Sequence, residues 1–456
     1  MNLDLFKKYN QPGPRYTSYP PATFFEGGFT PEQYVEQIIR SNDQQPQNMS
    51  FYVHIPFCPR LCHFCGCNTG ISQKEDTIRR YVDAVISEIK TVAKYLDKDR
   101  RLSQIHWGGG TPNSINLDYV EEIVATFHDN FTFIDHPEIA MECHPAYLEY
   151  EDIDRLAAAG FNRLSLGLQD FDEDVLKIVN RAPSKYPVKD LVAYLKEKGF
   201  RGVNLDLIYG LPGQTKESFA ENIRKTIAVS PDRLATFSYA HVPWVKSAQK
   251  ILEKRGMPSP DEKLQMFETG LNMLTEAGYV AIGMDHYAKA DDDLSLALKS
   301  KSLHRNFQGY VTRETTGQVY GFGSSSITQL WGGYIQNEKT AQQYMERIEA
   351  HGLAPDKAYI LREEDLVVRE VITEIMCNGH LDFKEIAELF HKRPEEVRQI
   401  VEFSPEKLRP FLEDGLVSID GDVIRIHKEG FFVVRNIAMA FDPMLKTSDA
   451  MYSKTI

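Results

Sequence analysis

Three cysteines, Cys58, Cys62 and Cys65, lie within eight residues of one another in the spacing Cys-x3-Cys-x2-Cys. Thiolates are the usual protein ligands of iron–sulfur clusters, and a loop this short can supply three of the four ligands of a cubane cluster. The fourth iron is then left without a protein ligand, so it can bind a substrate or cofactor directly. The spacing therefore predicts a catalytic [4Fe–4S] centre rather than a simple electron carrier.

Two other uses of clustered cysteines fit this sequence less well. A disulfide framework is typical of small secreted domains, whereas this chain has six cysteines in 456 residues and begins without a signal-peptide pattern. A structural zinc site could draw on Cys62 and Cys65 together with Cys58, Cys67 or His63. Such sites generally pair two separated ligand couples, and no second Cys-x2-Cys follows here. Zinc is therefore the main alternative to the cluster.

The other three cysteines are predicted to differ in role. Cys67 lies two residues beyond Cys65 and is either a buried small residue or a reactive group beside the cluster, since spacing does not distinguish the two. Cys143 and Cys377 stand alone in the sequence. Because free cysteine is commonly buried, both are expected to be structural.

The charge and length of the chain limit its class. A net charge of −13 argues against general binding to nucleic acid or to an anionic membrane. It does not exclude an acidic small molecule, which needs only a local cluster of arginines and lysines. No apolar run reaches the roughly 18 residues of a membrane-spanning helix. We expect about two to three domains, in a cytoplasmic protein that acts as a monomer.

The elements around the cysteines alternate between strands and helices. Strands are predicted at residues 50–55, 104–107, 138–142, 163–167, 202–208 and 233–239, and helices at residues 78–96, 119–130, 150–159, 173–180, 188–198 and 216–229. Asp76 or Thr77 is expected to cap the first of these helices. Six βα units predict a parallel sheet but are too few for a closed eight-stranded barrel. The fold class is therefore α/β, a partial and laterally open (βα)6 barrel of TIM type whose active site lies at the strand carboxyl ends.

Several polar or glycine positions fall at these strand ends. Residues 108–110 are three glycines, which let a backbone approach a ligand closely. Glu142 ends the third strand, where it could accept both hydroxyls of a ribose or could simply be a solvated side chain. Gln169 follows the fourth strand, and Asp206 interrupts an apolar run in the fifth, so its carboxylate needs buried partners.

The chain extends beyond the barrel at both ends. Residues 1–45 carry three prolines and a glycine between Asn10 and Pro20, which predicts an ordered N-terminal arm or lid. Residues 46–350 are assigned to the barrel and its extension. Residues 351–456 are predicted to form a mostly helical, winged-helix-like domain with a β-hairpin at residues 416–426 that turns at Asp420-Gly421. Its acidic composition favours a packing or lid role over DNA reading.

The cysteine spacing is that of the radical S-adenosylmethionine (SAM) enzymes. Over essentially its full length the chain resembles one family among them, the oxygen-independent coproporphyrinogen III oxidases, also called coproporphyrinogen dehydrogenases. The resemblance is carried by residues 14–20, 54–58, 65–67, 107–112, 161–165, 206–212, 284–286, 304–310 and 435–437. The chain departs from the family pattern near residues 313–318 and at Cys143-His144.

The resemblance implies one [4Fe–4S] cluster on Cys58, Cys62 and Cys65, together with two SAM molecules. By motif, the first SAM is expected to contact Tyr52, Gly109, Glu142 and Ile327, and the second Phe64, Gly66, Gly110, Thr111, Gln169, Arg181, Asp206 and Ala240. Strand alternation supports Tyr52 independently, because it places Tyr52 and His54 on the same face.

Two arginines outside the strand ends are assigned to substrate carboxylates. Arg15 lies in the proline-rich arm and Arg305 in the motif at residues 304–310. Arginine is favoured for this task because its planar fork pairs with carboxylates through two hydrogen bonds. The alternative is that both make surface or interdomain ion pairs.

The implied activity is the anaerobic oxidative decarboxylation of two propionates of coproporphyrinogen III to vinyl groups, which gives protoporphyrinogen IX in haem biosynthesis. A 5′-deoxyadenosyl radical is expected to remove the hydrogen, and a low-potential donor of flavodoxin or ferredoxin type to supply the electron. Two alternatives are a haem chaperone-like binding protein and a radical SAM enzyme acting on another tetrapyrrole. The chaperones of this kind typically lack the Arg15 arm and the Cys67 equivalent, and this chain has both.

Overall fold

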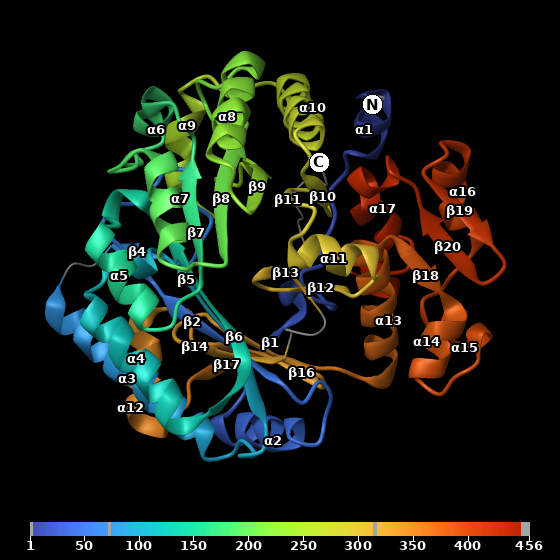
Figure 1. Cartoon of the computed structure of the whole chain (residues 1–456). Coiled ribbons are helices and arrows are strands. Elements are labelled where there is room, and N and C mark those ends of the chain that lie inside the picture. Colours follow the sequence, from blue (N-terminus) through green and yellow to red (C-terminus); the bar gives the residue numbers. More distant parts are fainter. Residues whose placement is uncertain (1–2, 72–73, 313–316, 448–456) are drawn as a thin grey trace.

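The computed structural model describes residues 3–71, 74–312 and 317–447. Its centre is a sheet of parallel strands with helices packed on the outer face (Figure 1). Part of the departure expected near residues 313–318 lies outside the described residues. In the part of the chain that is described, none of the helices is long and apolar enough to span a bilayer.

The six predicted strands pair side by side, all parallel and in chain order. They are β2 (Met49–Ile55), β5 (Arg101–Gly109), β6 (Thr132–Cys143), β7 (Arg163–Gln169), β8 (Gly202–Tyr209) and β9 (Arg233–Ser238). Phe51, Val53 and Ile55 are fully buried under the helices, whereas Tyr52 on the opposite face is partly exposed. The predicted partial barrel and the alternation of β2 are confirmed.

The helices between these strands also match the predicted pattern. They are α3 (Glu75–Ala93), α4 (Leu117–Asn130), α5 (Tyr150–Ala158), α6 (Glu173–Ile178), α7 (Val188–Glu197) and α8 (Lys216–Val229). The predicted cap of α3 is wrong. The helix begins after Lys74, which makes no side-chain capping bond, and Asp76 lies inside the first turn, where a carboxylate favours the positive end of the helix dipole.

Both edges of the parallel sheet are extended by strands that the alternation did not predict. On one edge β14 (Gln318–Phe322) pairs parallel to β2, and β15 (Ile327–Leu330), β16 (Gly333–Asn337), β17 (Pro355–Ile360) and β1 (Glu26–Gly27) follow antiparallel. On the other edge β11 (His286–Ala288) and β10 (Val280–Ile282) follow β9. The sheet thus includes residues on both sides of the predicted domain boundaries at residues 45 and 350. These boundaries stay predictions.

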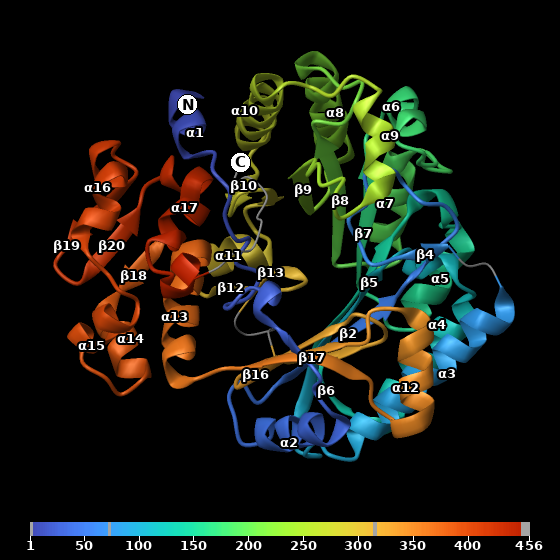
Figure 2. The ribbon, with the colours of Figure 1, turned by 180° about the vertical axis from the view of Figure 1, so that it is seen from behind.

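Shorter elements surround this sheet. The helices are α1 (Leu3–Tyr9), α2 (Pro31–Ser41), α9 (Lys250–Glu253), α10 (Pro260–Glu276), α11 (Asp293–Lys299) and α12 (Ala341–His351). Two small ribbons pair β3 (Phe57–Cys58) with β4 (Gly70–Ile71) and β12 (Leu303–Asn306) with β13 (Gly309–Thr312). In Figure 2 the β4 ribbon lies near the mouth of the barrel, below α9.

The C-terminal part is mostly helical, as predicted. It contains α13 (Glu363–Thr373), α14 (Phe383–Leu389), α15 (Pro394–Ile400), α16 (Pro405–Glu413) and α17 (Val434–Met439) beside a sheet of β18 (His380–Asp382), β20 (Val423–Ile426) and β19 (Val417–Asp420). The predicted Asp-Gly turn is wrong by one residue. Asp420 pairs with Val423, so the two-residue loop is Gly421-Asp422, with Gly421 in the left-handed region at φ 59°.

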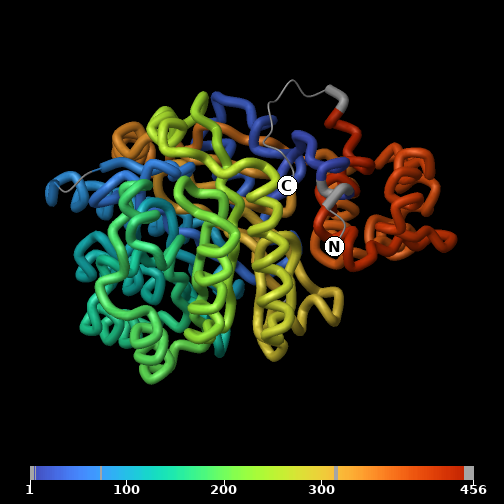
Figure 3. Tube along the Cα trace, turned by 90° about the horizontal axis from the view of Figure 1, so that it is seen from above, coloured from blue at the N-terminus to red at the C-terminus, as the bar shows by residue number. Residues whose placement is uncertain are grey.

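The N-terminal arm packs against this C-terminal part. Figure 3 shows the blue N-terminal segment beside the red helices. The Tyr9 ring stacks on Phe411 at 4.8 Å, and the Tyr16 hydroxyl donates to Asp442 at 2.9 Å. Tyr9, Tyr16 and Tyr19 belong to the hydrophobic core of the C-terminal helices. The arm is therefore an ordered part of the molecule, as expected.

One buried carboxylate ties a helix to the sheet edge. Glu88 of α3 is fully buried and accepts hydrogen bonds from the Gly323 amide at 2.9 Å, the Asn337 side chain at 2.7 Å and the Tyr344 hydroxyl at 2.6 Å. Burial raises the pKa of Glu88 to about 7, although these bonds oppose the shift. The contact fixes the turn between β14 and β15.

Replacing Glu88 by glutamine is expected to flatten the pH dependence of stability. Because the folded pKa of Glu88 exceeds the value of about 4.3 in an unfolded chain, ionisation disfavours folding as pH rises from about 4 to 7. Urea unfolding between pH 5 and 8 should therefore show a smaller loss of unfolding free energy with rising pH in Glu88→Gln. The exposed Glu36→Gln serves as control, and equal slopes in both variants would contradict the prediction.

Candidate active site

The cysteine loop is bonded directly to the glycine-rich end of β5. The Gly110 amide donates to Ile55 O at 2.8 Å, and the Thr111 amide donates to Phe57 O at 2.9 Å. A Cβ on Gly110 would lie 2.7 Å from Phe57 O and 2.9 Å from Cys58 Sγ. Only glycine permits this approach, so the sequence at β5 decides where the first thiol sits.

Each of the three predicted ligand thiols has a polar neighbour. Cys58 Sγ lies 3.4 Å from Thr111 Oγ1, Cys62 Sγ accepts from the Arg181 guanidinium at 3.4 Å, and Cys65 Sγ accepts from the Cys67 amide at 3.4 Å. Burial raises the pKa of Cys58 and of Cys62 despite Arg181. Hydrogen bonds from Cys67 lower the pKa of Cys65 to about 6.

This donor set fits an iron–sulfur cubane. In a cubane each thiolate binds its own iron, so the three sulfurs need not converge on one point. Among the described residues, no three His, Cys, Asp or Glu side chains are grouped closely enough to hold a single metal ion. Three thiols on one loop would hold three irons of such a cluster, with Arg181 to offset their negative charge, and the fourth iron would be free to bind a cofactor.

The remaining cysteines differ in exposure. Cys67 is exposed beside Cys65, so the interpretation of Cys67 as a buried small residue is wrong. Cys143 and Cys377 are buried, as expected. All six cysteines are free thiols, which contradicts a disulfide framework.

The residues expected around the first SAM lie at the ends of neighbouring strands. Tyr52 on β2 stacks on His106 of β5 with ring centroids 6.1 Å apart, and His106 Nε2 lies 3.1 Å from a carboxylate oxygen of Glu142 on β6. The Glu142 side chain is 47% exposed. Gly321 pairs with Tyr52 in the sheet, and a Cβ on Gly321 would lie 3.0 Å from the Ile327 backbone. The fold therefore brings this predicted set to one edge.

The Tyr52 hydroxyl is held by a neutral histidine. Burial raises the pKa of Tyr52 well above its usual value and lowers the pKa of His54. The phenol therefore donates to His54 Nδ1 at 3.1 Å, and His54 Nε2 donates to Asn68 O at 3.0 Å. Gly109, at φ 116°, passes so close that a Cβ would lie 2.8 Å from the His54 ring.

Two residues expected at the second SAM converge on Gly167. A Cβ at Gly167 would lie 3.1 Å from both the Gln169 amide nitrogen and an Arg181 guanidinium nitrogen. Arg181 is buried and donates to Gly167 O, yet its Nε and the Gln169 Oε1 are buried without a hydrogen-bond partner in the described structure. Because such orphaned atoms are costly, they indicate a ligand here.

Asp206 has the partners that its burial requires. Ser165 Oγ donates to it at 2.8 Å and Asn204 Nδ2 at 2.7 Å, while burial raises the pKa of the carboxyl. Phe64 and Ala240 are joined by one side chain, because Gln249 Nε2 donates to Phe64 O at 3.0 Å and to Ala240 O at 3.2 Å. Gly66 is exposed, with open space around its Cα.

Arg15 and Arg305 lie together although 290 positions separate them. Arg305 Nη1 donates to Arg15 O at 3.0 Å, and its guanidinium lies 5.1 Å from the centre of the Tyr310 ring. Both guanidinium groups help to lower the pKa of the Asp285 carboxyl, after the larger effect of His286, so the ion-pair alternative stays a prediction beside substrate binding. Burial and these two charges lower the pKa of Arg435 to about 10.

Several residues near the site were not predicted. His106 could have been found by alternation, since it faces the same side of β5 as Gly108. His286 lies 2.6 Å from Asp285 through Nδ1 on β11, a strand whose three residues are too short to show a period. Arg435 donates to Pro14 O at 3.1 Å and Gly13 O at 2.6 Å, which only the packing of the two chain ends reveals.

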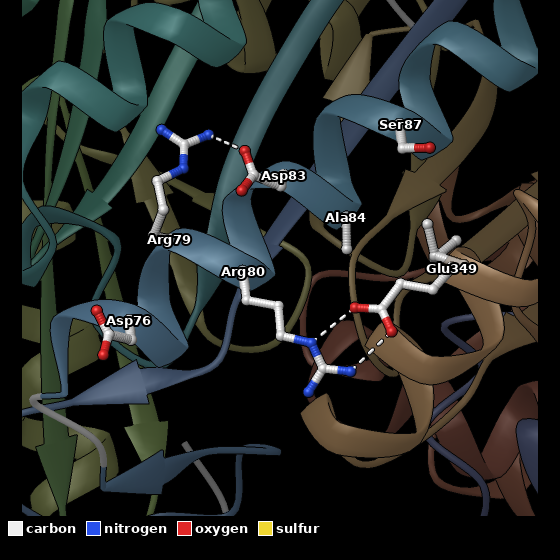
Figure 4. Close-up of a pocket in the computed structure, with 8 residues that line it drawn as sticks. Asp76, Arg79, Arg80, Asp83, Ala84, Ser87 and Glu349 are labelled. Atoms are coloured by element: carbon white, nitrogen blue, oxygen red, sulfur yellow. Dashed lines mark hydrogen bonds and ion pairs between the residues drawn. The ribbon is translucent and has the colours of Figure 1, made fainter.

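A surface hollow of about 420 Å³ lies away from the cysteine loop. It is formed by α3 and α12 and lined by charged side chains that include Arg80 and Glu349 (Figure 4). Arg80 Nε donates to Glu349 at 2.6 Å. Both of its arginines are paired with carboxylates, so we expect the chemistry of the molecule at the strand ends instead.

Comparison with known proteins agrees with this geometry. Residues 52–226 match the model of the radical SAM superfamily, and residues 361–433 match that of the HemN C-terminal domain. The chain is 38% identical over 453 residues to the oxygen-independent coproporphyrinogen III oxidases of Salmonella typhimurium (strain LT2) and Escherichia coli (strain K12), an overlap of 99% of this chain and 97% of each relative. The relative from Synechocystis is 38% identical over 458 residues, with 100% and 98% covered.

A solved structure shares the whole fold. Coproporphyrinogen III oxidase (HemN) from Escherichia coli, described as a radical SAM enzyme, matches with a TM-score of 0.90 at 37% identity, over 97% of this chain and 98% of that one. The fold and the cysteine site thus define a radical SAM enzyme, with a [4Fe–4S] cluster and SAM as cofactors, and the zinc alternative is wrong. Within this class the chain belongs to the family of oxygen-independent coproporphyrinogen III oxidases.

Replacing Gly110 by alanine is expected to reduce cluster assembly. The added methyl group would overlap Phe57 O and Cys58 Sγ and displace the first thiol. Iron analysis after anaerobic reconstitution should give well under half of the roughly four irons per chain of the unmodified protein. Gly70→Ala is the matched control, because nothing lies within 4 Å of its Cβ position. Full iron content in Gly110→Ala would contradict this reading of the loop.

Proposed function

We propose that this chain decarboxylates two propionates of coproporphyrinogen III to vinyl groups under anaerobic conditions and so forms protoporphyrinogen IX. The observation that carries the proposal is the loop of three thiols bonded to the end of β5. The chain that holds this loop is related over its full length to oxygen-independent coproporphyrinogen III oxidases. Each propionate loses one hydrogen atom, one electron and CO₂.

The chemistry of the cofactors sets the task of the protein. When bound, the cluster and SAM supply a 5′-deoxyadenosyl radical, which removes the hydrogen atom from the propionate. The chain must hold the reacting groups close together and keep water away from them, because orientation lowers the barrier most when the reacting atoms are in contact. Partly exposed Tyr52, buried His54 and the close glycines form the wall of the barrel at that end.

We assign the residues to two SAM molecules. Tyr52, Gly109, Glu142 and Ile327 would hold the first, with the Glu142 carboxylate accepting from the ribose. Phe64, Gly66, Gly110, Thr111, Gln169, Arg181, Asp206 and Ala240 would hold the second. The orphaned Gln169 Oε1 and Arg181 Nε support this second group, since a bound polar ligand would satisfy both.

Arg15 and Arg305 would bind substrate carboxylates. Coproporphyrinogen carries four propionates, and a protein of net charge −13 repels such an anion at long range. Recognition therefore has to come from a local group of cations. The mutual proximity of Arg15, Arg305 and Arg435, which lowers the pKa of Arg435, supports this assignment.

Anaerobic turnover with chemically reduced enzyme is the direct test. The holoenzyme with dithionite, SAM and coproporphyrinogen III should release protoporphyrinogen IX, and equilibrium dialysis should find two SAM molecules per chain. Cys62→Ser should abolish SAM cleavage. Haem binding without turnover would instead support the chaperone alternative, and a different tetrapyrrole product would support the other enzyme class.

Arg15→Ala is expected to raise KM for coproporphyrinogen at least tenfold. A hydrogen bond to a charged group contributes about 1.5–3 kcal/mol, and about 1.4 kcal/mol corresponds to a factor of ten. Steady-state kinetics should show this change while iron content and SAM affinity remain those of the unmodified enzyme. Arg40→Ala, which removes an exposed arginine of α2, is the control. An unchanged KM would contradict the assignment of Arg15 to substrate binding and favour a surface or interdomain ion pair.

A further inference from the structure

The segment that follows β9, residues 242–255, is attached to the outside of the cysteine loop. Lys246 Nζ donates to Cys67 O at 2.7 Å, and Gln249 Nε2 donates to Phe64 O at 3.0 Å. Leu252 of α9 is fully buried in a small core against which Phe64 packs. Figure 2 shows α9 and the β4 end of the cysteine loop on the same side of the barrel. The segment therefore lies directly against the loop that carries the predicted cluster ligands.

Three large apolar side chains of this segment, which we call its apolar centre, are exposed. Trp244 is 61% exposed, Val245 is 66% exposed and Ile251 is 43% exposed. Exposed apolar groups that gather on one short segment mark an interaction site more often than scattered single residues do. Tryptophan is also one of the three side chains enriched among the residues that contribute most of the binding energy of a protein interface.

The rim of the same face is cationic. Lys250, Lys254 and Arg255 are exposed, and Lys250 and Lys254 lie one helical turn apart on the same side as Ile251. Residues 242–255 contain four cations and one carboxylate, Glu253, which lies 3.1 Å from His241 Nε2. The segment beside the cysteine loop is therefore positively charged in a chain whose net charge is −13.

We propose that this surface, Trp244, Val245 and Ile251 with the rim of Lys250, Lys254 and Arg255, is the docking site of the acidic one-electron carrier protein that reduces the cluster. The proposal rests on the function proposed above, which requires an electron for SAM cleavage. The reduced carrier loses one electron and the cluster gains one, with no atom transferred. The net negative charge of the chain disfavours an acidic protein generally, so the cationic rim directs it to this face.

Charge reversal separates docking from catalysis. The probe is reduced flavodoxin, an acidic one-electron donor, added to the anaerobic holoenzyme. The triple variant Lys250→Glu, Lys254→Glu, Arg255→Glu should bind flavodoxin at least tenfold more weakly in a titration at low salt. Flavodoxin-driven SAM cleavage should fall equally, whereas dithionite-driven cleavage and iron content should stay at the level of the unmodified enzyme. Added salt should weaken binding to the unmodified enzyme and change binding to the variant little.

A matched variant controls for net charge. Lys90→Glu, Lys94→Glu, Arg101→Glu reverses two lysines and one arginine that are also exposed, at the end of α3 and the start of β5. These residues lie at the opposite end of the strands, so flavodoxin should bind this variant nearly as well as the unmodified enzyme. Equal losses in the two triple variants would overturn the proposal, because they would report net charge alone.

Trp244→Ala tests the apolar centre without changing charge. It should weaken flavodoxin binding at least tenfold and leave dithionite-driven turnover of coproporphyrinogen III intact. If dithionite-driven turnover falls as much, Trp244 serves the active site and the docking assignment is wrong. Flavodoxin binding that no variant changes, or that the unmodified enzyme lacks, also overturns it. Failure of the unmodified enzyme to cleave SAM with dithionite would instead refute the proposed function.

Discussion

The site depends on one constraint, the contact of the cysteine loop with the glycine-rich end of β5. Two backbone hydrogen bonds, Gly110 to Ile55 and Thr111 to Phe57, join the ends of neighbouring strands. Because Gly110 has no Cβ, the loop can approach until Cys58 touches the turn. The position of the Cys58 thiol therefore depends on the β2–β5 pairing and not on the loop alone.

Charge is distributed to serve this site in a chain that is acidic overall. Arg181 bonds to Cys62, where thiolates would otherwise repel one another. Arg15, Arg305 and Arg435 gather where the arm meets the C-terminal helices. Partly buried Asp206 and fully buried Glu88 are each held by several donors, which offset the cost of removing a carboxylate from water. The arginines are thus concentrated at particular sites, so the electrostatic potential at a bound ligand is not given by the net charge of −13.

The two ends of the chain meet across the open side of the partial barrel. The arm contributes Tyr9, Tyr16 and Tyr19 to the core of the C-terminal helices, and Arg435 binds the carbonyls of Gly13 and Pro14. Burial lowers the pKa of Arg435, and the two hydrogen bonds from its guanidinium to the arm offset part of the cost of burying that charge. This packing holds the arm against the C-terminal helices and positions Arg15 beside Arg305.

The sequence by itself determined the six parallel strands, their helices and the three cysteines, because long apolar repeats and a dense ligand spacing are local signals. It also indicated the positions of Tyr52 and Glu142 on their strands, because alternation and strand ends are local signals too; their contact with SAM stays a prediction. Tertiary structure decided the strands β14 to β17, the His106–Glu142 contact, the Gly421-Asp422 turn and the exposure of Cys67. It also brought together Arg15 and Arg305, which 290 positions separate. The physical reason is that short antiparallel strands and side-chain contacts between distant segments leave no period in the sequence, since they depend on which surfaces pack together.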